Sequence, residues 1–399
     1  MNTVFYTLVF GAVVVPDCFC AKFYDSLKSV KGEILERYNK DAVPVPNRET
    51  SLVINVTLYV MALQRLDEKS QVLSSSGFFM IEWDDFMFKW NKSRLDNMDR
   101  MTVKVKDLWV PDVFVVNSVG DMRVSHLGEN EYVNVLSNGH MTWYPSCELM
   151  TSCSVDISRY PFDVQICSIR IESWYHDGRD FVFKPGNPGI DFSSSHFTEN
   201  GEWQITNMTS YAYYYAHYVD DSIFYTGIEY KITLARRSQY HFLTTVFPFL
   251  ILMFLNTIST LIPTECGEKI GFCMSQFLTM IVYLTLVAQC MPVSSLTISD
   301  FAIVVGSQIL ISGISTFVVA LSICFQSKPE NSRPPMLLQM VLTPITYFRN
   351  VYSEGMHNSD ITKISWKLLD KRINNALKVM LYSNVLVCFC FVTFFQWMI

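Results

Sequence analysis

Four apolar stretches in the second half of the chain restrict its fold more than any other feature. They cover residues 242–262, 270–291, 301–325 and 379–398. Each is close to the roughly twenty residues that an α-helix needs to cross a bilayer. We therefore expect an all-α transmembrane part, with three spans within 238–325 and a fourth within 379–399.

The charges between the third and fourth stretches predict the orientation of the chain. Residues 326–378 contain eight basic side chains against four acidic ones, and short cytoplasmic segments carry such an excess. This segment is expected to be short and intracellular, with amphipathic helices, of which residues 336–348 are the clearer example. Four crossings then leave both ends of the chain outside the cell.

The amino-terminal half has the marks of a secreted domain. Residues 1–21 form an apolar run with the length of a signal peptide, and three glycosylation sequons, at Asn55, Asn91 and Asn207, precede the first apolar stretch. With a net charge of −6 and no long basic run, the chain is not expected to bind nucleic acid. We expect a multi-pass plasma-membrane protein, a postsynaptic membrane being one such location, with residues 22–237 outside.

Residues 22–237 have the pattern of a β-sandwich preceded by a helix. Leu27–Tyr38 places apolar residues at helical spacing. The rest consists of short alternating or β-branched runs separated by turn residues, as in a sandwich. These runs are 52–63, 72–90, 101–105, 132–136, 164–171 and 225–234.

One loop in this domain is distinctive. Cys153 and Cys167 enclose thirteen residues, whose middle is Tyr160-Pro161-Phe162-Asp163. A bond between such cysteines would close a loop of about fifteen residues, worth about 3 kcal/mol, and its apolar tip would need a partner. Together with the four apolar stretches, this loop resembles the signature of the Cys-loop receptors, the pentameric ligand-gated channels typified by nicotinic acetylcholine and serotonin type 3 receptors. The alternative is a stapled hairpin in another secreted sandwich.

The resemblance extends from about residue 27 to the end of the chain. It implies an extracellular immunoglobulin-like β-sandwich with an N-terminal helix, followed by a four-helix transmembrane bundle, in a homo- or heteropentamer. It also implies a disulfide between Cys153 and Cys167, which leaves Cys147 as a buried, reduced thiol. Trp109-Val-Pro-Asp112 is similar to a Trp-x-Pro-Asp element of the family.

The resemblance further implies a ligand site between subunits, where an aromatic box holds a cationic amine. Trp174 and Tyr225 fall on aromatic positions of one face, and Phe78 falls on a tryptophan position of the opposite face. The expected ligand-binding residues are Trp174, Tyr225, Phe78, Met80, Asn117, His217 and Tyr218.

Two departures from the nicotinic pattern concern this site. Val116 stands where nicotinic subunits carry a tyrosine, and Val219-Asp220 stands where acetylcholine-binding subunits carry adjacent cysteines. The tyrosine-rich run 211–218 has an alternative interpretation as an exposed edge hairpin without a ligand, because aromatic side chains also pack at strand edges.

The second apolar stretch has a regular face. Its members recur at spacings of 4, 3, 4, 3 and 4, which places Gly271, Ser275, Leu278, Val282, Thr285 and Gln289 on one side of a helix. Five copies would line a water-filled pore with a constriction at Leu278 and Val282. Glu268 and Glu265 at its inner mouth would form carboxylate rings, which favour cations. Alternatively, Glu268 and Lys269 simply end a helix at the membrane surface.

These features together predict a subunit of a cation-selective channel opened by an extracellular ligand. The resemblance implies that binding closes the segment bearing Tyr225 onto Trp174, and that the movement reaches the membrane through the residues of a coupling region. That region comprises Asp67, Glu68, Tyr160, Pro161, Phe162, Asp163, Arg236 and the link 292–300. Identical or related subunits, membrane lipids and permeant cations are the expected partners.

Two alternatives remain at this level. The chain could be an auxiliary or orphan subunit that needs a partner subunit or responds to a non-classical ligand such as an amphiphile, protons or zinc. It could also be a non-conducting binding or trafficking subunit, which the polar face of the second stretch argues against. The sequence contains no nucleotide loop, metal cluster or nucleophile–base set, so neither an enzyme nor a cofactor is expected. His196, His217 and His241 are isolated in the sequence and are expected to be structural.

Overall fold

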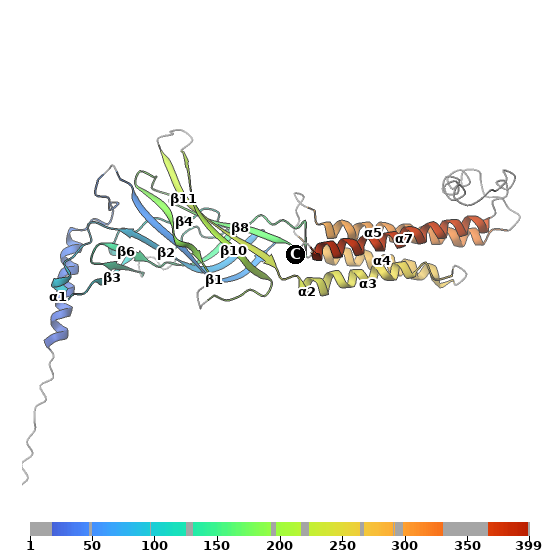
Figure 1. Cartoon of the computed structure of the whole chain (residues 1–399), viewed down its shortest axis with the longest axis horizontal. Coiled ribbons are helices and arrows are strands. Elements are labelled where there is room, and N and C mark those ends of the chain that lie inside the picture. The colour runs from blue at the N-terminus through green and yellow to red at the C-terminus, as the bar shows by residue number, and fades with distance from the viewer. Residues whose placement is uncertain are drawn as a thin grey trace, which may run out of the picture.

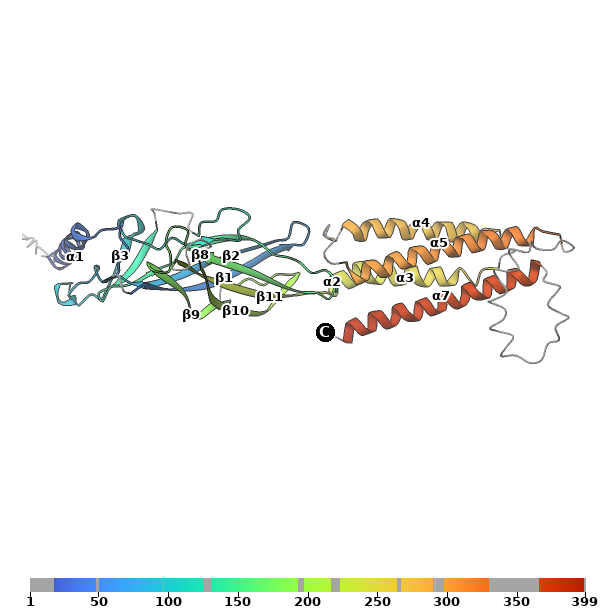
Figure 2. The same cartoon turned by 90° about the horizontal axis from the view of Figure 1, so that it is seen from above.

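The structure is a computed structural model that describes residues 18–47, 50–95, 97–124, 131–192, 197–216, 223–263, 267–289, 291, 298–329 and 366–397. Figures 1 and 2 show an elongated molecule with helix α1 at one end, a β-sandwich next to it, and a bundle of long helices at the other end. The predicted fold class, a β-sandwich followed by membrane helices, is confirmed.

The strands form two antiparallel-rich sheets. The larger has the order β3-β5-β6-β2-β1-β9, with β7 also paired to β2, and the smaller has the order β10-β11-β8-β4. Their bounds are β1 Leu52–Asp67, β2 Val72–Asp84, β3 Arg100–Lys104, β4 Phe114–Val115, β5 Tyr132–Leu136, β6 His140–Trp143, β7 Ser146–Ser152, β8 Val164–Glu172, β9 Phe181–Asp191, β10 Trp203–Ala216 and β11 Phe224–Arg236.

The core lies between the two sheets. Alternate residues of β7 and β8 are buried and exposed, as expected for strands with one face toward a core. At the end away from the membrane, Trp109 packs edge-on against Trp83 and Phe181, with ring centroids 6.1 and 6.0 Å apart. These buried rings join the segment around Trp109 to strands β2 and β9.

Helix α1, Cys18–Arg37, begins nine residues before the predicted start at Leu27. Its Val30 and Ile34 are buried. Just beyond it, the Tyr38 hydroxyl donates a hydrogen bond to the buried Asp85 (2.7 Å) and accepts one from the backbone N–H of Trp109 (3.2 Å). Asp85 also accepts the N–H of Met87, and the chain leaves β2 at this point rather than at the predicted residue 90.

The helices that follow are α2 Gln239–His241, a π-helical turn η4 Phe242–Val246, α3 Phe247–Ile258, α4 Glu268–Gln289, α5 Asp300–Gln326 and α7 Trp366–Trp397. Three segments are long and apolar enough to cross a membrane within the residues described: 239–258, 268–289 and 300–326. The predicted fourth span, which begins at residue 379, coincides with α7 as far as Trp397. The end of α7 near the mark C lies at the sandwich end of the bundle in both views.

Helices α5 and α7 pair through polar side chains. Gln308 donates to Asn384, Ser322 donates to Asn374 (3.5 Å), and Gln326 donates to Asp370 (3.1 Å). Such bonds stabilise helix association where the surroundings are apolar.

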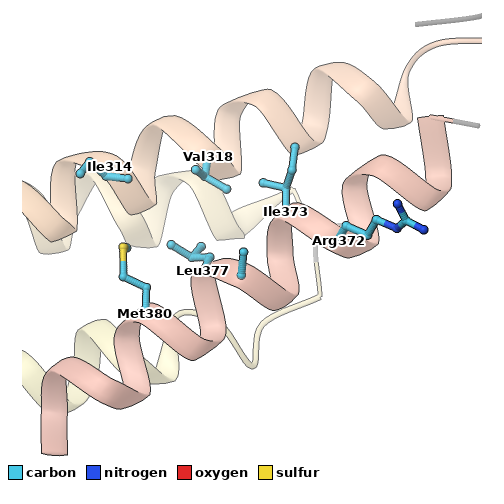
Figure 3. Close-up of a pocket in the computed structure, with 7 residues that line it drawn as sticks. Ile314, Val318, Arg372, Ile373, Leu377 and Met380 are labelled. Carbon is cyan, nitrogen blue, oxygen red and sulfur yellow. The ribbon is translucent and has the colours of Figure 1, made fainter. Parts of the chain in front are cut away.

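A cavity of about 210 Å³ lies between α5 and α7, in the region of these hydrogen bonds. Figure 3 shows Ile314 and Val318 of α5 facing Leu377 and Met380 of α7, while the guanidinium of Arg372 points away from them.

Several predictions fall on residues outside the described part of the chain. These are the signal peptide up to residue 17, His196, His217, Tyr218, Glu265, most of the link 292–300, and residues 330–365 with the expected amphipathic helix.

Candidate functional site

The position of Trp174 is determined by Asp112, the last residue of the Trp-Val-Pro-Asp element. One Asp112 carboxylate oxygen accepts the backbone N–H groups of Trp174 (2.8 Å) and Tyr175 (2.9 Å), and the carboxylate also accepts the hydroxyl of Ser173. The turn after β8 is thereby fixed with Trp174 about 60% exposed. A large aromatic side chain held in this way at the surface is available for binding.

Other aromatic rings lie on the strands next to Trp174. Phe114 of β4 lies 6.1 Å from Trp174 and 6.0 Å from Tyr175, measured between ring centroids. Across the sheet, Tyr215 and Tyr225 stack at 5.5 Å. A cavity of about 340 Å³ opens beside Trp174 and is lined by Phe114, Gly120, Asp121, Met122, Arg123, Trp174 and Tyr175.

A carboxylate lies among these rings. Glu172, the last residue of β8, accepts hydrogen bonds from the hydroxyls of Tyr213 and Tyr215, the latter at 2.8 Å. Burial, together with the bond to Glu172, raises the pKa of Tyr213, and the same causes raise the pKa of Tyr215 to about 12. Both tyrosines therefore remain neutral hydrogen-bond donors at physiological pH.

Strand register explains this arrangement. Tyr213, Gly227, Glu172 and Phe114 are successive partners across β10, β11, β8 and β4, so they lie in one row on one face. A Cβ at Gly227 would come within 2.6 Å of the Tyr213 ring. Because residue 227 is glycine, the Tyr213 ring can pass over β11 and reach Glu172.

Sequence reasoning missed Glu172, Tyr213, Tyr215 and Phe114. A usable signal was the two-residue spacing between Glu172 and Trp174 and between Tyr213 and Tyr215, since residues two apart in a strand share a face. Residues 211–216 of the tyrosine run belong to the edge strand β10, and the hydroxyls of Tyr213 and Tyr215 are directed to Glu172.

The opposite-face residue Phe78 also lies in an aromatic cluster. It stacks on Tyr59 at 4.8 Å and meets the edge of Tyr144 at 6.2 Å. Met80 is half-buried on the same face of β2. Asn117 differs, since its side chain bonds the backbone of Ser168 (2.8 Å) and Arg170 (3.0 Å). These bonds assign Asn117 to the framework of the site.

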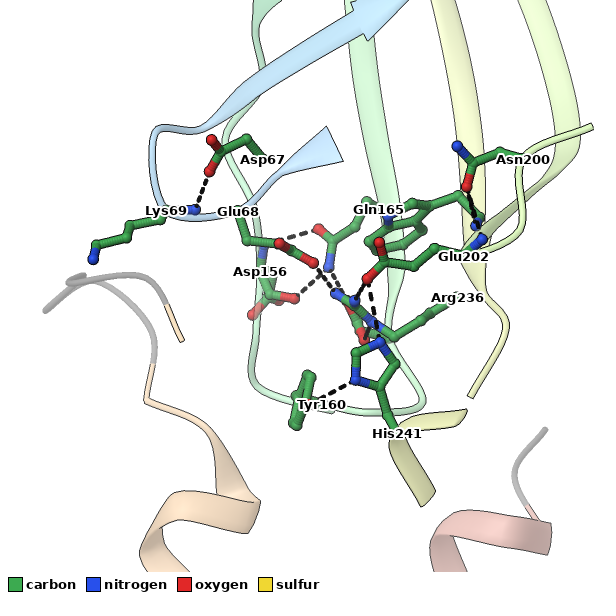
Figure 4. A network of polar contacts seen from close by, with 12 residues as sticks. Asp67, Glu68, Lys69, Asp156, Tyr160, Gln165, Asn200, Glu202, Arg236 and His241 are labelled. Atoms are coloured by element: carbon green, nitrogen blue, oxygen red, sulfur yellow. Dashed lines mark hydrogen bonds and ion pairs between the residues drawn. The ribbon is translucent and has the colours of Figure 1, made fainter. Parts of the chain in front are cut away.

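A second cluster lies at the membrane end of the sandwich, around Arg236 at the end of β11 (Figure 4). Its guanidinium, about 1% exposed, binds Asp163 (2.7 Å), Glu68 (2.6 Å) and Glu202 (2.9 Å). It also lies 4.2 Å above the ring of Trp203. Burial opposes the charge of Arg236, but the bonds from these acids outweigh burial and raise its pKa. We call Arg236 and its three carboxylate partners the Arg236 cluster.

The Arg236 cluster joins the sandwich to the membrane helices. His241 of α2 contacts Glu202 at 3.2 Å and the Tyr160 hydroxyl at 3.0 Å. The bond from His241, more than any other cause, lowers the pKa of Glu202. The ring centroids of Tyr160 and Phe301 are 6.5 Å apart, and the backbone N–H of Asp300 donates a hydrogen bond to the backbone carbonyl of Ser158 (3.0 Å).

These contacts revise one expectation about this region and agree with another. His241 is not isolated, because folding brings it to Glu202 and Tyr160, which lie far from it in the sequence. The apolar tip predicted to need a partner finds it in α2 and the start of α5, where Tyr160 is buried. Asp67 caps its own turn by accepting the N–H groups of Lys69 and Ser70, while Glu68 reaches Arg236.

The disulfide between Cys153 and Cys167 is present, which confirms the predicted pair. Cys147 is a free, buried thiol, as predicted, and burial raises its pKa to about 12. Asn91 and Asn207 are exposed, whereas Asn55 lies half-buried in β1 between β2 and β9, followed by the fully buried Thr57. Asn55 is therefore the poorest of the three sequons for a glycan.

Helix α4 has two distinct faces. Its buried face packs on the neighbouring helices, with Gln276 donating to the carbonyl of Leu252 (2.8 Å) and Tyr283 to that of Thr245 (2.7 Å). The opposite face is exposed in the single chain, and it carries Glu268, Gly271, Ser275, Leu278, Val282, Thr285 and Gln289. Every residue predicted to line a pore within α4 thus points away from the helices of its own chain.

Comparison with known proteins agrees with these features. Residues 28–238 match the family described as the neurotransmitter-gated ion-channel ligand binding domain. The chain is 29% identical over 262 residues to the neuronal acetylcholine receptor subunit alpha-2 of Homo sapiens, covering 65% of this chain and 48% of that protein. It is 27% identical over 267 residues to the alpha-6 subunit of Homo sapiens, covering 67% of this chain and 53% of that protein. The matched region spans about half the length of these relatives.

Proposed function

Since the chain belongs to the neurotransmitter-gated ion-channel family, we propose that it is one subunit of a pentameric, cation-selective channel opened by an extracellular ligand. The observation that carries the proposal is the pairing of two features in one chain. One is an exposed aromatic group with a carboxylate around Trp174. The other is a membrane helix whose polar and small residues face away from its own bundle.

The aromatic group supports a cationic ligand. The faces of Trp174, Tyr215 and Tyr225 carry negative electrostatic potential and attract a cation, with about 0.5–2 kcal/mol for each good contact. In the proposed pentamer, the cluster of Phe78, Tyr59 and Tyr144 on the neighbouring subunit would close the site. Relatives named as acetylcholine receptor subunits are consistent with an amine ligand.

We expect Trp174→Ala to raise the activating concentration of a cationic agonist at least about tenfold, because it removes the largest exposed ring of the site. Trp174→Phe should raise it less, since a smaller aromatic face remains. Concentration–response curves recorded from oocytes injected with each variant measure this. Unchanged potency in both variants would remove Trp174 from the ligand site.

The same recording addresses the alternative of an auxiliary subunit. The chain would be expressed by itself and given amines, amino acids, protons, zinc and amphiphiles in turn. Current from the single chain supports a self-sufficient channel. Surface expression without current under every ligand would favour the auxiliary function.

The exposed face of α4 supports the conducting function. Five copies around an axis would place Leu278 and Val282 at an apolar constriction and Glu268 at the inner mouth. The Arg236 cluster and Tyr160 contact α2 and α5, so they offer a continuous path from the sandwich to the membrane helices. We propose that ligand binding reaches the pore through these contacts.

We expect Glu268 to set the charge selectivity. Two charges 4 Å apart interact by about 4 kcal/mol at an effective dielectric constant of 20, so five carboxylates near the axis would attract cations and repel anions. Glu268→Gln should lower cation conductance, and Glu268→Ala with a proline inserted before it should shift the reversal potential toward that of chloride. The measurement is the reversal potential under NaCl dilution.

Glu268→Asp is the matched control, because it keeps the charge and should keep the selectivity. Glu265 is expected to matter less, since it would lie nearer the wide, screened vestibule. A wild-type channel that reverses at the chloride potential contradicts the assignment of cation selectivity.

A further inference from the structure

We propose that Glu172 makes this site selective for amines that carry at least one N–H bond, over quaternary ammonium ions. This inference rests on the proposed function, since it names the ligand class of the same aromatic site. It goes further because a ring attracts any cation, whereas a carboxylate also accepts a hydrogen bond from an ammonium that has a proton to donate.

Glu172 lies between the two halves of the aromatic group. On one side, its register partner Phe114 contacts the Trp174 ring. On the other side, Tyr215 bonds Glu172 through its hydroxyl and stacks on Tyr225 through its ring. A cation held against Trp174 and Tyr225 would therefore meet the carboxylate.

Glu172 forms no salt bridge in the described part of the chain, although the charge of Arg170 acts on its partner Tyr213. No Lys, Arg or His there forms a salt bridge with Glu172 within 4.0 Å, although Arg236, Arg237 and Arg179 all pair with acids. An ionised carboxylate offers about four acceptor positions. The two tyrosine hydroxyls occupy two of them, fix the direction of the group, and leave capacity for a ligand N–H.

A nearby carboxylate provides a matched control. Glu229 also accepts a hydrogen bond from a tyrosine, Tyr211, on the same sheet. It lies two residues further along β11 than Gly227 and pairs with Arg170, in the direction away from Trp174. Glu172 and Glu229 thus share residue type and each accept a tyrosine hydroxyl, but only Glu172 adjoins the aromatic group.

The test uses four cations with one skeleton: 2-phenylethylamine and its N-methyl, N,N-dimethyl and N,N,N-trimethyl derivatives. Their affinities for the full-length protein in lipid nanodiscs are measured by calorimetry at pH 7, where all four are charged. In the wild type, we expect the quaternary member to bind at least about tenfold more weakly than the dimethyl member, as expected for a lost charge-assisted hydrogen bond.

Glu172→Gln should reduce that ratio to about twofold or less, whereas Glu229→Gln should leave it at the wild-type value. If Glu172 only positions the tyrosines, all four affinities should fall together with the ratio unchanged, and that result overturns the inference. Equal or tighter binding of the quaternary member by the wild type overturns it as well.

Trp174→Ala separates this inference from the proposed ligand site. Weaker binding of all four cations in Trp174→Ala, with no effect of Glu172→Gln on the ratio, would leave the aromatic site standing and refute only the assignment of Glu172. Absence of binding of all four to the wild type, or binding that is indifferent to Trp174→Ala, would refute both.

Discussion

Replacing Arg236 by glutamine is expected to destabilise the extracellular domain by about 3–5 kcal/mol, because it leaves buried carboxylates without their cation. Asp163 is about 2% exposed at its side chain and loses both its bonds to the guanidinium. A glutamine cannot neutralise it, and the neighbouring Glu68 and Glu202 add like charges. The midpoint of thermal unfolding of the purified full-length protein should fall by on the order of 10 °C.

The next residue in the chain is the control for this variant. Arg237 forms an exposed ion pair with Glu199 at 2.7 Å, with 41% and 75% of the two side chains exposed. Exposed pairs contribute about 0–1 kcal/mol, so Arg237→Gln should leave the midpoint nearly unchanged. Equal losses in both variants would show that burial of the Arg236 cluster does not govern its stability.

Cys153→Ser should be the other large effect, with a loss of about 3 kcal/mol from opening a loop of about fifteen residues. The loop carries both Tyr160, which contacts the membrane helices, and Asp163, which binds Arg236. Its loosening is therefore expected to abolish surface expression, measured by labelling intact cells. Cys167→Ser should have the same effect.

Cys147→Ser distinguishes loss of the disulfide from loss of any buried cysteine. Cys147 is 5% exposed, and the one hydrogen bond described for its side chain runs from the thiol to the carbonyl of Gly77 at 3.6 Å. A serine hydroxyl can make the same kind of bond, so surface expression should remain close to that of the wild type. A loss as large as that of Cys153→Ser would mean that the disulfide is not the source of the stability.

The order of a β-sandwich followed by long apolar helices could be predicted from the sequence, because it depends on local patterns. Strand alternation over residues such as 132–136, which is β5 as observed, arises from one buried face. The apolar length of 301–325, which agrees with α5 within one residue at each end, arises from the thickness of a bilayer. Strands with weaker alternation, such as β9 with its Gly-Pro segment 185–189, were not recognised.

Only part of the candidate site could be predicted from the sequence. Trp174, Phe78 and Arg236 were predicted because the family resemblance assigns a role to each of their positions. Glu202 and His241 have no such motif, and their role becomes visible only where β10, β11 and α2 converge.

The sequence by itself located several of the strands, the long apolar helices and the loop between Cys153 and Cys167, since periodicity and apolar length act on neighbouring residues. Only the tertiary structure decided which charges meet. Glu172 and Tyr213 are 41 residues apart, and Glu68 and Arg236 are 168 apart. Such contacts depend on the register of whole strands, which is set by packing of the entire sandwich, and a shift of one residue would turn each side chain to the other face.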